Sequence, residues 1–380
     1  MIPRQIEADL ARQIQTGGKA VIIFGARQVG KTTLVRCLVE GLPQRVLWIS
    51  ADELRYVDVL SSRDLRQLRG LVAGYDLLVI DEAQRVPEIG MGLKLLIDNL
   101  PDLRIVVTGS SSLELASRTR EPLTGRAWRH VLHPIATCEL GRLHNPFELQ
   151  ALLPERLVFG SYPELFSIPG HADKRAYLTQ LTDSYIFKDV LELSSIRHAA
   201  KLRKLLQLLA FQIGNEVSVA ELAGQLELSR DTVASYIDLL EASFVLFRLS
   251  GYNRNLRKEV SKKDKIYFWD IGVRNALIGH LQPLGQRVDQ GQLWENFIIA
   301  ERRKWLAYSA SSANTYFWRT HTGAEIDWIE ASEGPLAGYE FKWREGPARP
   351  PRSFLDAYPG ARFTVITPAN HLAFVGAAES

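Results

Sequence analysis

The sequence predicts an α/β protein in which residues 1–140 form a doubly wound parallel sheet. Apolar, β-branched runs alternate with helical patterns along this part of the chain. The runs are continuous, as in parallel strands that are buried on both faces. The chain has 380 residues, which is too long for one ordinary domain, so we expect the sheet to be one of several domains.

The elements of this sheet follow in order along the chain. Continuous apolar runs predict strands at Ala20–Phe24, Arg45–Ile49, Leu77–Ile80, Leu103–Val107 and Trp128–Leu132. Helical spacing predicts the intervening helices at Thr33–Glu40, Ser62–Ala73 and Val86–Asn99. Strands that alternate with helices in this way indicate a sheet covered on both faces.

Beyond residue 140 the pattern changes. Residues 141–215 carry leucines at helical spacing, which predicts a helical lid or linker. Residues 216–280 predict a winged-helix segment, and residues 290–380 a smaller α/β domain that begins with a helix at Leu293–Leu306. Its expected strands are Thr315–Arg319, Glu325–Glu330, Gly338–Lys342 and Arg362–Thr367.

Composition argues against several classes of protein. The two cysteines, Cys37 and Cys138, are far apart, which argues against a disulfide framework or a zinc cluster and favours a reducing cytoplasm. The N-terminus lacks the apolar core of a signal peptide, and no run approaches the roughly 18 apolar residues of a membrane span. Net charge is only +3, so any nucleic-acid surface must be a local patch.

A phosphate-binding loop follows the first expected strand. The run from Gly25 to Thr32 matches GxxxxGK[ST] and lies between a strand and a helix, the context that this motif needs. Its glycines let backbone N–H groups surround phosphates at a helix N-terminus. We expect Lys31 to reach the outer phosphates of ATP and Thr32 to bind Mg²⁺. The residues expected to hold ATP are Gly25, Ala26, Arg27, Gln28, Val29, Gly30, Lys31, Thr32 and Thr33.

Two carboxylates end the strand at Leu77–Ile80. Asp81 is expected at the C-terminal edge of the sheet, where open α/β sheets bind ligands, and there it would hold Mg²⁺ with Thr32. Glu82 would orient and activate the attacking water. An acidic pair after a strand is often a solvated turn, but its combination with the phosphate-binding loop favours the catalytic interpretation.

Small polar residues and one arginine complete the expected site. Ser110, or else Thr108, would contact the γ-phosphate or the water, and Ser111 could equally be a helix N-cap. Arg126 is a candidate arginine finger that offsets charge on the transferred phosphoryl group, although a surface role is the commoner one. The sequence leaves open whether Arg126 acts within its own chain.

Runs distributed over nearly the whole chain resemble a known family. The first are GARQVGKTTL, LLVIDEAQ, RIVVTGSSS, LTGR, HPIATCEL, FGSYPEL and YIFKDV. The later ones are DTVASYIDLLEASFVLFRLSGYNRN, KIYFWDIGVRNAL, LWENFI, YFWRTHTGAEIDWI and YEFKWR. This set is similar to prokaryotic AAA+ ATPases that carry a C-terminal domain of unknown function. The resemblance implies ATP binding and a restriction-endonuclease-like fold for the C-terminal domain. Because AAA+ cores commonly complete their sites with a neighbour's arginine, it also implies a homo-oligomer.

The C-terminal part carries a possible second site. Asp327 lies in one expected strand, and Glu340 and Lys342 lie two residues apart on one face of the next. This arrangement resembles the PD-(D/E)xK nucleases, in which acids hold Mg²⁺ and a lysine polarises the water. Glu295, in the preceding helix, could complete the metal site. Alternatively, these are ordinary polar side chains that face solvent.

The middle segment suggests DNA as a partner. Its helix–turn–helix would direct Arg230, Thr232, Ser235 and Tyr236 at the major groove. A basic run from Tyr252 to Lys265 would contact phosphates; its bases are Arg254, Arg257, Lys258, Lys262, Lys263 and Lys265. Two functions remain open: an ATPase that acts on DNA, whose nuclease-like domain binds or cuts it, and a P-loop switch that binds protein partners.

Overall fold

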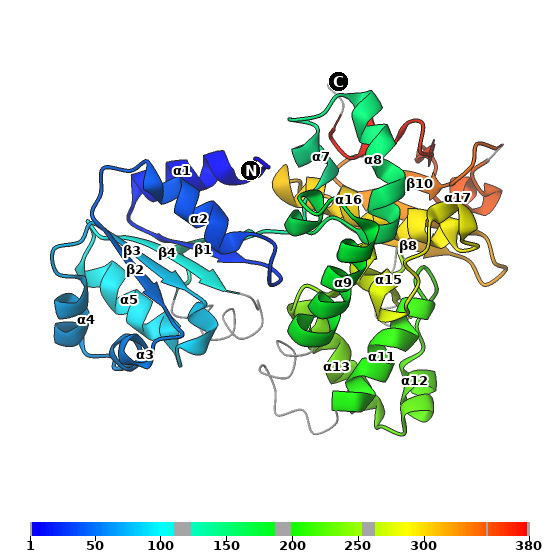
Figure 1. The fold of residues 1–380 in the computed structure, drawn as a ribbon. Helices are drawn as coiled ribbons and strands as arrows, with labels where there is room; N and C mark the ends of the chain where they lie inside the picture. Colours follow the sequence, from blue (N-terminus) through cyan, green and yellow to red (C-terminus); the bar gives the residue numbers. More distant parts are fainter. Residues whose placement is uncertain (1, 110–122, 187–198, 253–262, 347–348, 378–380) are drawn as a thin grey trace.

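The computed structural model describes residues 2–109, 123–186, 199–252, 263–346 and 349–377, with the backbone alone at 184–186. The N-terminal sheet domain lies on one side of the molecule and the rest of the chain on the other, with the N-terminus between them (Figure 1). None of the helices in the described ranges combines the length and the hydropathy of a bilayer-spanning segment.

The N-terminal domain has the predicted parallel sheet. Its strands are β1 Ala20–Phe24, β2 Val46–Ser50, β3 Leu77–Asp81, β4 Arg104–Gly109 and β5 Ala127–Val131. They lie in the order β2-β3-β4-β1-β5, and every pairing is parallel. All five residues of β1 and of β3 are buried, which explains why these strands are continuous apolar runs.

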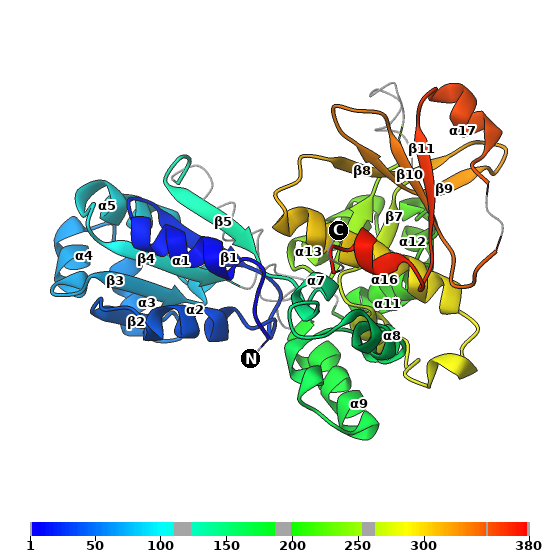
Figure 2. The same ribbon diagram turned by 90° about the horizontal axis from the view of Figure 1, so that it is seen from above.

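Helices cover both faces of this sheet, so the domain is doubly wound. On one face α1 (Glu7–Thr16) and α2 (Lys31–Glu40) pack against Val21, Ile23 and Val79. On the other face α3 (Leu54–Ser61), α4 (Leu65–Val72) and α5 (Ile89–Asn99) pack against the alternate strand residues. In Figure 1 the sheet lies between these layers, and Figure 2 looks onto the face covered by α1 and α2.

The sequence prediction for this domain left out one helix. The helix expected at Ser62–Ala73 is α4, and α3, which was not expected, precedes it. Arg63 takes a left-handed backbone conformation with φ 54°, which ends α3. Asp64 then caps α4 by accepting a hydrogen bond from Arg66 N at 2.8 Å.

The middle of the chain is mostly helical. It contains α7 Thr137–Leu140, α8 Pro146–Phe159, the 3₁₀ turn η2 Pro163–Phe166, α9 His171–Gln180, the π-helical turn η3 Leu181–Ile186 and α11 Ala199–Phe211. The expected helix–turn–helix follows as α12 Val219–Leu226 and α13 Arg230–Ala242, and Ser229 caps α13 by accepting from Thr232 N. Next come the antiparallel pair β6 Leu246–Leu249 and β7 Lys265–Phe268, then α15 Ile271–Leu277 and the 3₁₀ turn η4 Leu284–Gln286.

The last part is a four-stranded mixed sheet behind a long helix, α16 Gln290–Tyr308. Its strands are β8 Asn314–Arg319, β9 Glu325–Ala331, β10 Ala337–Phe341 and β11 Arg362–Ile366, with α17 Arg352–Ala357 before β11 and α18 His371–Phe374 after it. The order is β11-β10-β9-β8, with antiparallel pairs except β10–β11. Asn296 of α16 bonds both the N–H and the carbonyl of Phe268 at 2.8 Å, which ties this part to β7.

Candidate nucleotide-binding site

The loop from Gly25 to Lys31 has the backbone geometry of an anion cradle. Gly25 and Gly30 have φ of 151° and 95°, and Gln28 has φ 61°. A Cβ atom at Gly25 would lie 2.2 Å from the carbonyl oxygen of Leu132, so only glycine fits there. Gly30 is the N-cap of α2 and has no side chain to cap it, which leaves the first N–H groups of the helix directed at this loop.

Lys31 lies over the loop. Its side chain is buried, and Nζ donates to the carbonyl oxygens of Gly25 at 2.9 Å and Ala26 at 2.8 Å. The ammonium group is therefore held within a few ångströms of the turn that would enclose phosphates. These two partners are neutral carbonyls, which an anionic phosphate can replace, since hydrogen bonds between two charged groups are stronger.

Thr32, Asp81 and Thr108 meet at the C-terminal edge of the sheet. Thr32 Oγ1 donates to Asp81 Oδ2 at 2.9 Å, and Thr108 Oγ1 donates to Asp81 Oδ1. A hydroxyl and a carboxylate side by side are oxygen ligands of the kind that Mg²⁺ prefers, so these residues fit that ion. Thr108, the second choice from the sequence, is fully buried against Asp81; Ser110 and Ser111 lie outside the described residues.

Glu82 follows with an unusual backbone. It adopts the left-handed conformation, with φ 55° and ψ 39°, at the start of the turn Ala83–Arg85. Its N–H donates to Thr108 Oγ1 at 3.4 Å, and its carboxylate accepts from the side chain of Gln84. A non-glycine residue in this conformation is strained, and such strain gathers at functional sites.

Arg126 lies at the wrong edge of the sheet for its own phosphate-binding loop. It directly precedes β5, whose first residue pairs with Ala20 at the start of β1, whereas Gly25 follows the end of β1. Five strand residues separate these edges by roughly 15 Å. Its guanidinium pairs with Asp98 at 2.6 Å, which raises the pKa of Arg126. Of the two possibilities that the sequence left open, this position disfavours a role within its own chain, and a role on a neighbouring chain stays a prediction.

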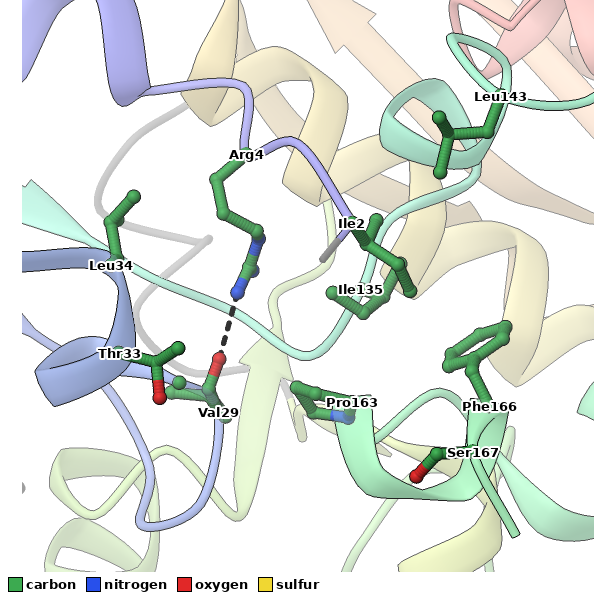
Figure 3. A pocket seen from close by; sticks show the side chains of 11 residues that line it. Ile2, Arg4, Val29, Thr33, Leu34, Ile135, Leu143, Pro163, Phe166 and Ser167 are labelled. Atoms are coloured by element: carbon green, nitrogen blue, oxygen red, sulfur yellow. Dashed lines mark hydrogen bonds between the residues drawn. The ribbon is translucent and has the colours of Figure 1, made fainter. Parts of the chain in front are cut away.

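A cavity of about 410 Å³ opens beside Gly30. Its walls come from the N-terminal segment, the phosphate-binding loop, α2, the chain around Ile135 and η2 (Figure 3). They are mainly apolar, and the lining residues are Ile2, Arg4, Val29, Gly30, Thr33, Leu34, Ile135, Leu143, Pro163, Phe166 and Ser167. Sequence reasoning missed this cavity, because its walls come from segments that are far apart along the chain.

The helical part also touches the phosphate-binding loop directly. Tyr177 of α9 donates from its hydroxyl to Gln28 Oε1 at 2.9 Å. Arg4, in the N-terminal segment, donates to the carbonyl oxygen of Val29 at 2.7 Å (Figure 3). The loop thus lies between the sheet domain and the helices that follow it, a location favoured by ligand sites at domain junctions.

The C-terminal carboxylates gather at one edge of the mixed sheet. Asp327 Oδ2 accepts from Phe341 N at 2.8 Å, which brings Asp327 beside Glu340 on the neighbouring strand. Lys342 Nζ donates to Glu340 at 2.6 Å, as expected for two residues on one face. Burial and the nearby carboxylates of Glu295 and Glu340 raise the pKa of Asp327 well above its usual range.

A lysine that the sequence did not single out for this cluster balances its charge. Lys265 of β7 is 2% exposed, lies 3.4 Å from Glu295 Oε1 and pairs with Glu325. Burial alone would lower its pKa, but the carboxylates of Glu295 and Glu325 raise it. Nowhere in the described residues are three His, Cys, Asp or Glu side chains arranged to hold a metal ion. This arrangement does not support the predicted metal site of Glu295, Asp327 and Glu340, because the ammonium group of Lys265 occupies the space among carboxylates of the cluster.

Several predicted DNA contacts also fail. Tyr236 is 7% exposed and packs in the core of the helix–turn–helix, so it cannot reach a groove, although Arg230 and Ser235 are exposed. Tyr252 packs against the rings of Tyr316 and Tyr358. Lys265 is buried in the carboxylate cluster. Of the basic run, Arg254, Arg257, Lys258 and Lys262 lie outside the described residues.

Three family models match successive parts of the chain. Residues 17–141 match an AAA domain, residues 150–283 match the domain of unknown function DUF8612, and residues 290–375 match the domain of unknown function DUF4143. None of these descriptions bears on the restriction-endonuclease-like fold, which stays a prediction.

Two relatives and one solved structure match large parts of the chain. An uncharacterized protein of Mycobacterium tuberculosis is 29% identical over 98% of this chain and 81% of its own length. An uncharacterized protein of Methanocaldococcus jannaschii is 27% identical over 73% of this chain and 66% of its own length. A Walker-type ATPase of Pyrococcus abyssi superposes with a TM-score of 0.51 at 16% identity, over 73% of this chain and 96% of that one. The N-terminal domain therefore has the fold of a P-loop ATPase of the AAA type.

Proposed function

We propose that this protein binds and hydrolyses ATP with Mg²⁺ at the loop Gly25–Thr32. The observation that carries the proposal is the contact of Thr32 with Asp81 directly beside that loop. The backbone N–H groups of the loop and of the start of α2 bind the phosphates, and Lys31 exchanges its carbonyl partners for phosphate oxygens. When bound, Mg²⁺ neutralises phosphate charge; Thr32 and Asp81 are the side chains that would hold it.

Glu82 is the proposed residue for orienting the attacking water. Glu82 directly follows Asp81 in the chain and has a strained, left-handed backbone. Its N–H donates to the hydroxyl of Thr108, which helps to hold that backbone in place. A carboxylate in this place accepts a hydrogen bond from a water molecule, and this bond directs a lone pair of the water oxygen at the terminal phosphorus atom. Thr108 is the proposed polar contact at the end of β4, since its hydroxyl is already bonded to Asp81.

The cavity beside Gly30 is the proposed site of the nucleotide base. It adjoins the phosphate-binding loop, has apolar walls from Ile2, Ile135 and Phe166, and has the size of a small-molecule site. ATP bound in this way would touch both the sheet domain and the helical part. Binding and hydrolysis would then alter how the two parts contact each other, which is how a nucleotide can drive a conformational change.

The test is a steady-state measurement of phosphate release with Mg²⁺. The unaltered chain should hydrolyse ATP, and Lys31→Ala should remove turnover, because the phosphates lose their main cationic contact. An exposed lysine away from the site, Lys263→Ala, is the matched control and should keep the parental rate. Absence of ATP turnover and of ATP binding in the unaltered chain would contradict the proposal.

We further propose that any DNA contact is made by residues 252–263 and not by α13. Residues 216–249 carry two bases and six acids, a net charge of −4, and Arg248 is paired with Asp238 and Glu241. Such a surface repels phosphates. Residues 252–263 carry five bases and one acid, a net +4, which favours non-specific phosphate contacts.

A salt series of DNA gel shifts tests this second proposal. Replacing Arg254, Arg257, Lys258, Lys262 and Lys263 with glutamine should weaken binding equally across sequences, and each charge removed should flatten the salt slope by about one unit. Arg230→Gln is the control and should change little. Unchanged DNA affinity in the fivefold variant would favour the alternative, a P-loop switch that binds protein partners.

We also propose that the chain forms homo-oligomers, with Arg126 at the contact. Arg126 is remote from its own phosphate-binding loop, so only a neighbouring chain could use it at a nucleotide. Specific ATPase activity should then rise with protein concentration, and the rise should disappear in Arg126→Ala. A flat specific activity across a wide dilution series, together with a monomer in sedimentation, would contradict it.

A further inference from the structure

We propose that Arg4 is a positioning residue for ATP, which holds the phosphate-binding loop in its binding geometry from outside the motif. The inference rests on the proposed nucleotide site. Arg4 lies in the N-terminal segment before α1, and its residue is 4% exposed despite its charge. A buried guanidinium is retained only where its donors are satisfied, so its partners indicate what it does.

All three guanidinium nitrogens donate, each to a different segment. Nη1 donates to the carbonyl oxygen of Val29 in the phosphate-binding loop at 2.7 Å (Figure 3). Nη2 donates to the carbonyl oxygen of His133, after β5, at 2.5 Å, and Nε donates to Glu139 of α7 at 3.0 Å. One planar group thus connects the loop, the segment after β5 and the first helix of the helical part.

The contact with Val29 fixes a peptide group of the loop. In a trans peptide the carbonyl and the following N–H point in opposite directions. With the Val29 carbonyl held by Arg4, the N–H of Gly30 is turned away from Arg4 and is kept available to a phosphate. Gly30 has φ 95°. Glycine has little intrinsic preference between positive and negative φ, so an external contact is needed to hold this peptide group in one orientation.

The other contacts hold the Arg4–Glu139 ion pair in a fixed position. Glu139 Oε1 also accepts from Gln5 N at 2.9 Å, and Glu139 Oε2 accepts from Ala136 N at 2.9 Å. Both carboxylate oxygens are therefore engaged, and the ion pair with Arg4 is almost fully buried. Because Glu139 belongs to α7, Arg4 fixes the position of the phosphate-binding loop relative to the helical part as well as relative to the segment after β5.

Equilibrium binding of a fluorescent ATP analogue tests the inference in the full chain. Arg4→Ala should weaken ATP binding by at least about tenfold, as expected for loss of a charged hydrogen bond that orders the site. Inorganic tripolyphosphate, used as competitor, should lose affinity by the same factor, because the loop that binds phosphates is what changes. Arg4→Lys keeps the charge beside Glu139 but cannot serve three acceptors, so its affinities should be intermediate.

Arg156 provides the matched control. It is also 4% exposed and pairs with the buried Glu301 at 3.3 Å, but its hydrogen bonds go to Ser161, Thr137 and Ile135. Arg156→Ala should lower the unfolding temperature about as much as Arg4→Ala and leave ATP affinity within about twofold of the unaltered chain.

The outcomes separate this inference from the function on which it rests. ATP and tripolyphosphate affinities that are unaltered in Arg4→Lys and in folded Arg4→Ala would overturn the role of Arg4, and so would a loss for ATP alone. If Lys31→Ala loses ATP binding in the same experiment, the proposed function still stands. An unaltered chain that binds neither ATP nor tripolyphosphate would overturn both.

Discussion

The ammonium group of Lys265 lies 3.4 Å from the carboxylate of Glu295, although one residue is on β7 and the other on α16. The same ammonium pairs with Glu325 and lies over the ring of Phe317. Tyr267 donates its hydroxyl to the same oxygen of Glu295 at 2.6 Å. A lysine on a strand of the preceding segment therefore offsets part of the negative charge at the edge of the C-terminal sheet.

Removing this charge should destabilise the contact between the two parts. Lys265→Met keeps the length of the side chain but leaves the half-buried carboxylate of Glu295 without its cation, and Glu325 with Arg319 alone. This loss should cost about 1–3 kcal/mol. Chemical unfolding should show that loss. Lys263→Met, at an exposed neighbouring position, is the control and should change stability by less than about 0.5 kcal/mol. Equal stability of both variants would mean that Lys265 does not balance the cluster.

Divalent metal should have little effect on this cluster while Lys265 is present. Adding Mg²⁺ or Mn²⁺ without nucleotide is expected to leave the unfolding temperature unchanged, since a ligand stabilises only the state that binds it. Metal-dependent cleavage of DNA is likewise not expected. A metal-dependent rise in unfolding temperature that disappears in Asp327→Asn would restore the metal site.

Asp327 should make the protein less stable as the pH rises. Burial, together with the carboxylates of Glu295 and Glu340, raises its pKa in the folded protein. Its stabilising contribution is full below the unfolded value near 3.8 and is lost as the pH rises through the folded value. Asp327→Asn should therefore raise stability at neutral pH, because the amide cannot ionise in this surrounding. The gain should vanish near pH 3; a gain that is equal at both pH values would refute the assignment.

Glu301 should make the protein less stable as the pH falls, which is the opposite of the effect of Asp327. Burial raises its pKa, but the charges of Lys304 and Arg156 outweigh burial and lower the pKa of Glu301 to about 2. The ionised Glu301 stabilises the folded protein above the pKa of 4.5 that it has when unfolded. This stabilisation, on the order of 3 kcal/mol, is lost as the pH falls toward 2. In Glu301→Gln this acid dependence should be absent. Glu333→Gln, an exposed control, should keep it.

The ATPase fold could be predicted from the sequence because its signals are local. Each strand of the parallel sheet is a short apolar run, and the loop at Gly25 and the acids at Asp81 follow strands directly. The β-strands after residue 310 were predicted for the same reason. The prediction left out α3 and started the next helix at Ser62, whereas the left-handed conformation of Arg63 delays its start to Leu65.

The candidate sites could be predicted only in part, because the missing members are brought in by tertiary packing. Arg4 is 25 residues from Val29 and 135 from Glu139, and nothing in the N-terminal sequence marks it as a partner of the loop. Lys265 was counted with a basic run, but its position on β7 carries it into the carboxylate cluster. Arg126 ends the run LTGR, which suggested an arginine finger. Because β5 starts beside Ala20, Arg126 lies at the edge of the sheet opposite to the phosphate-binding loop.

The most direct test of the account is ATP binding and turnover in Glu82→Gln. The side chain keeps its size and loses the charge that orients the water, while Lys31, Thr32 and the loop are intact. Affinity for ATP should stay within about threefold of the unaltered chain, and turnover should fall by about 100-fold or more. Parental turnover in Glu82→Gln would contradict the proposed hydrolytic site.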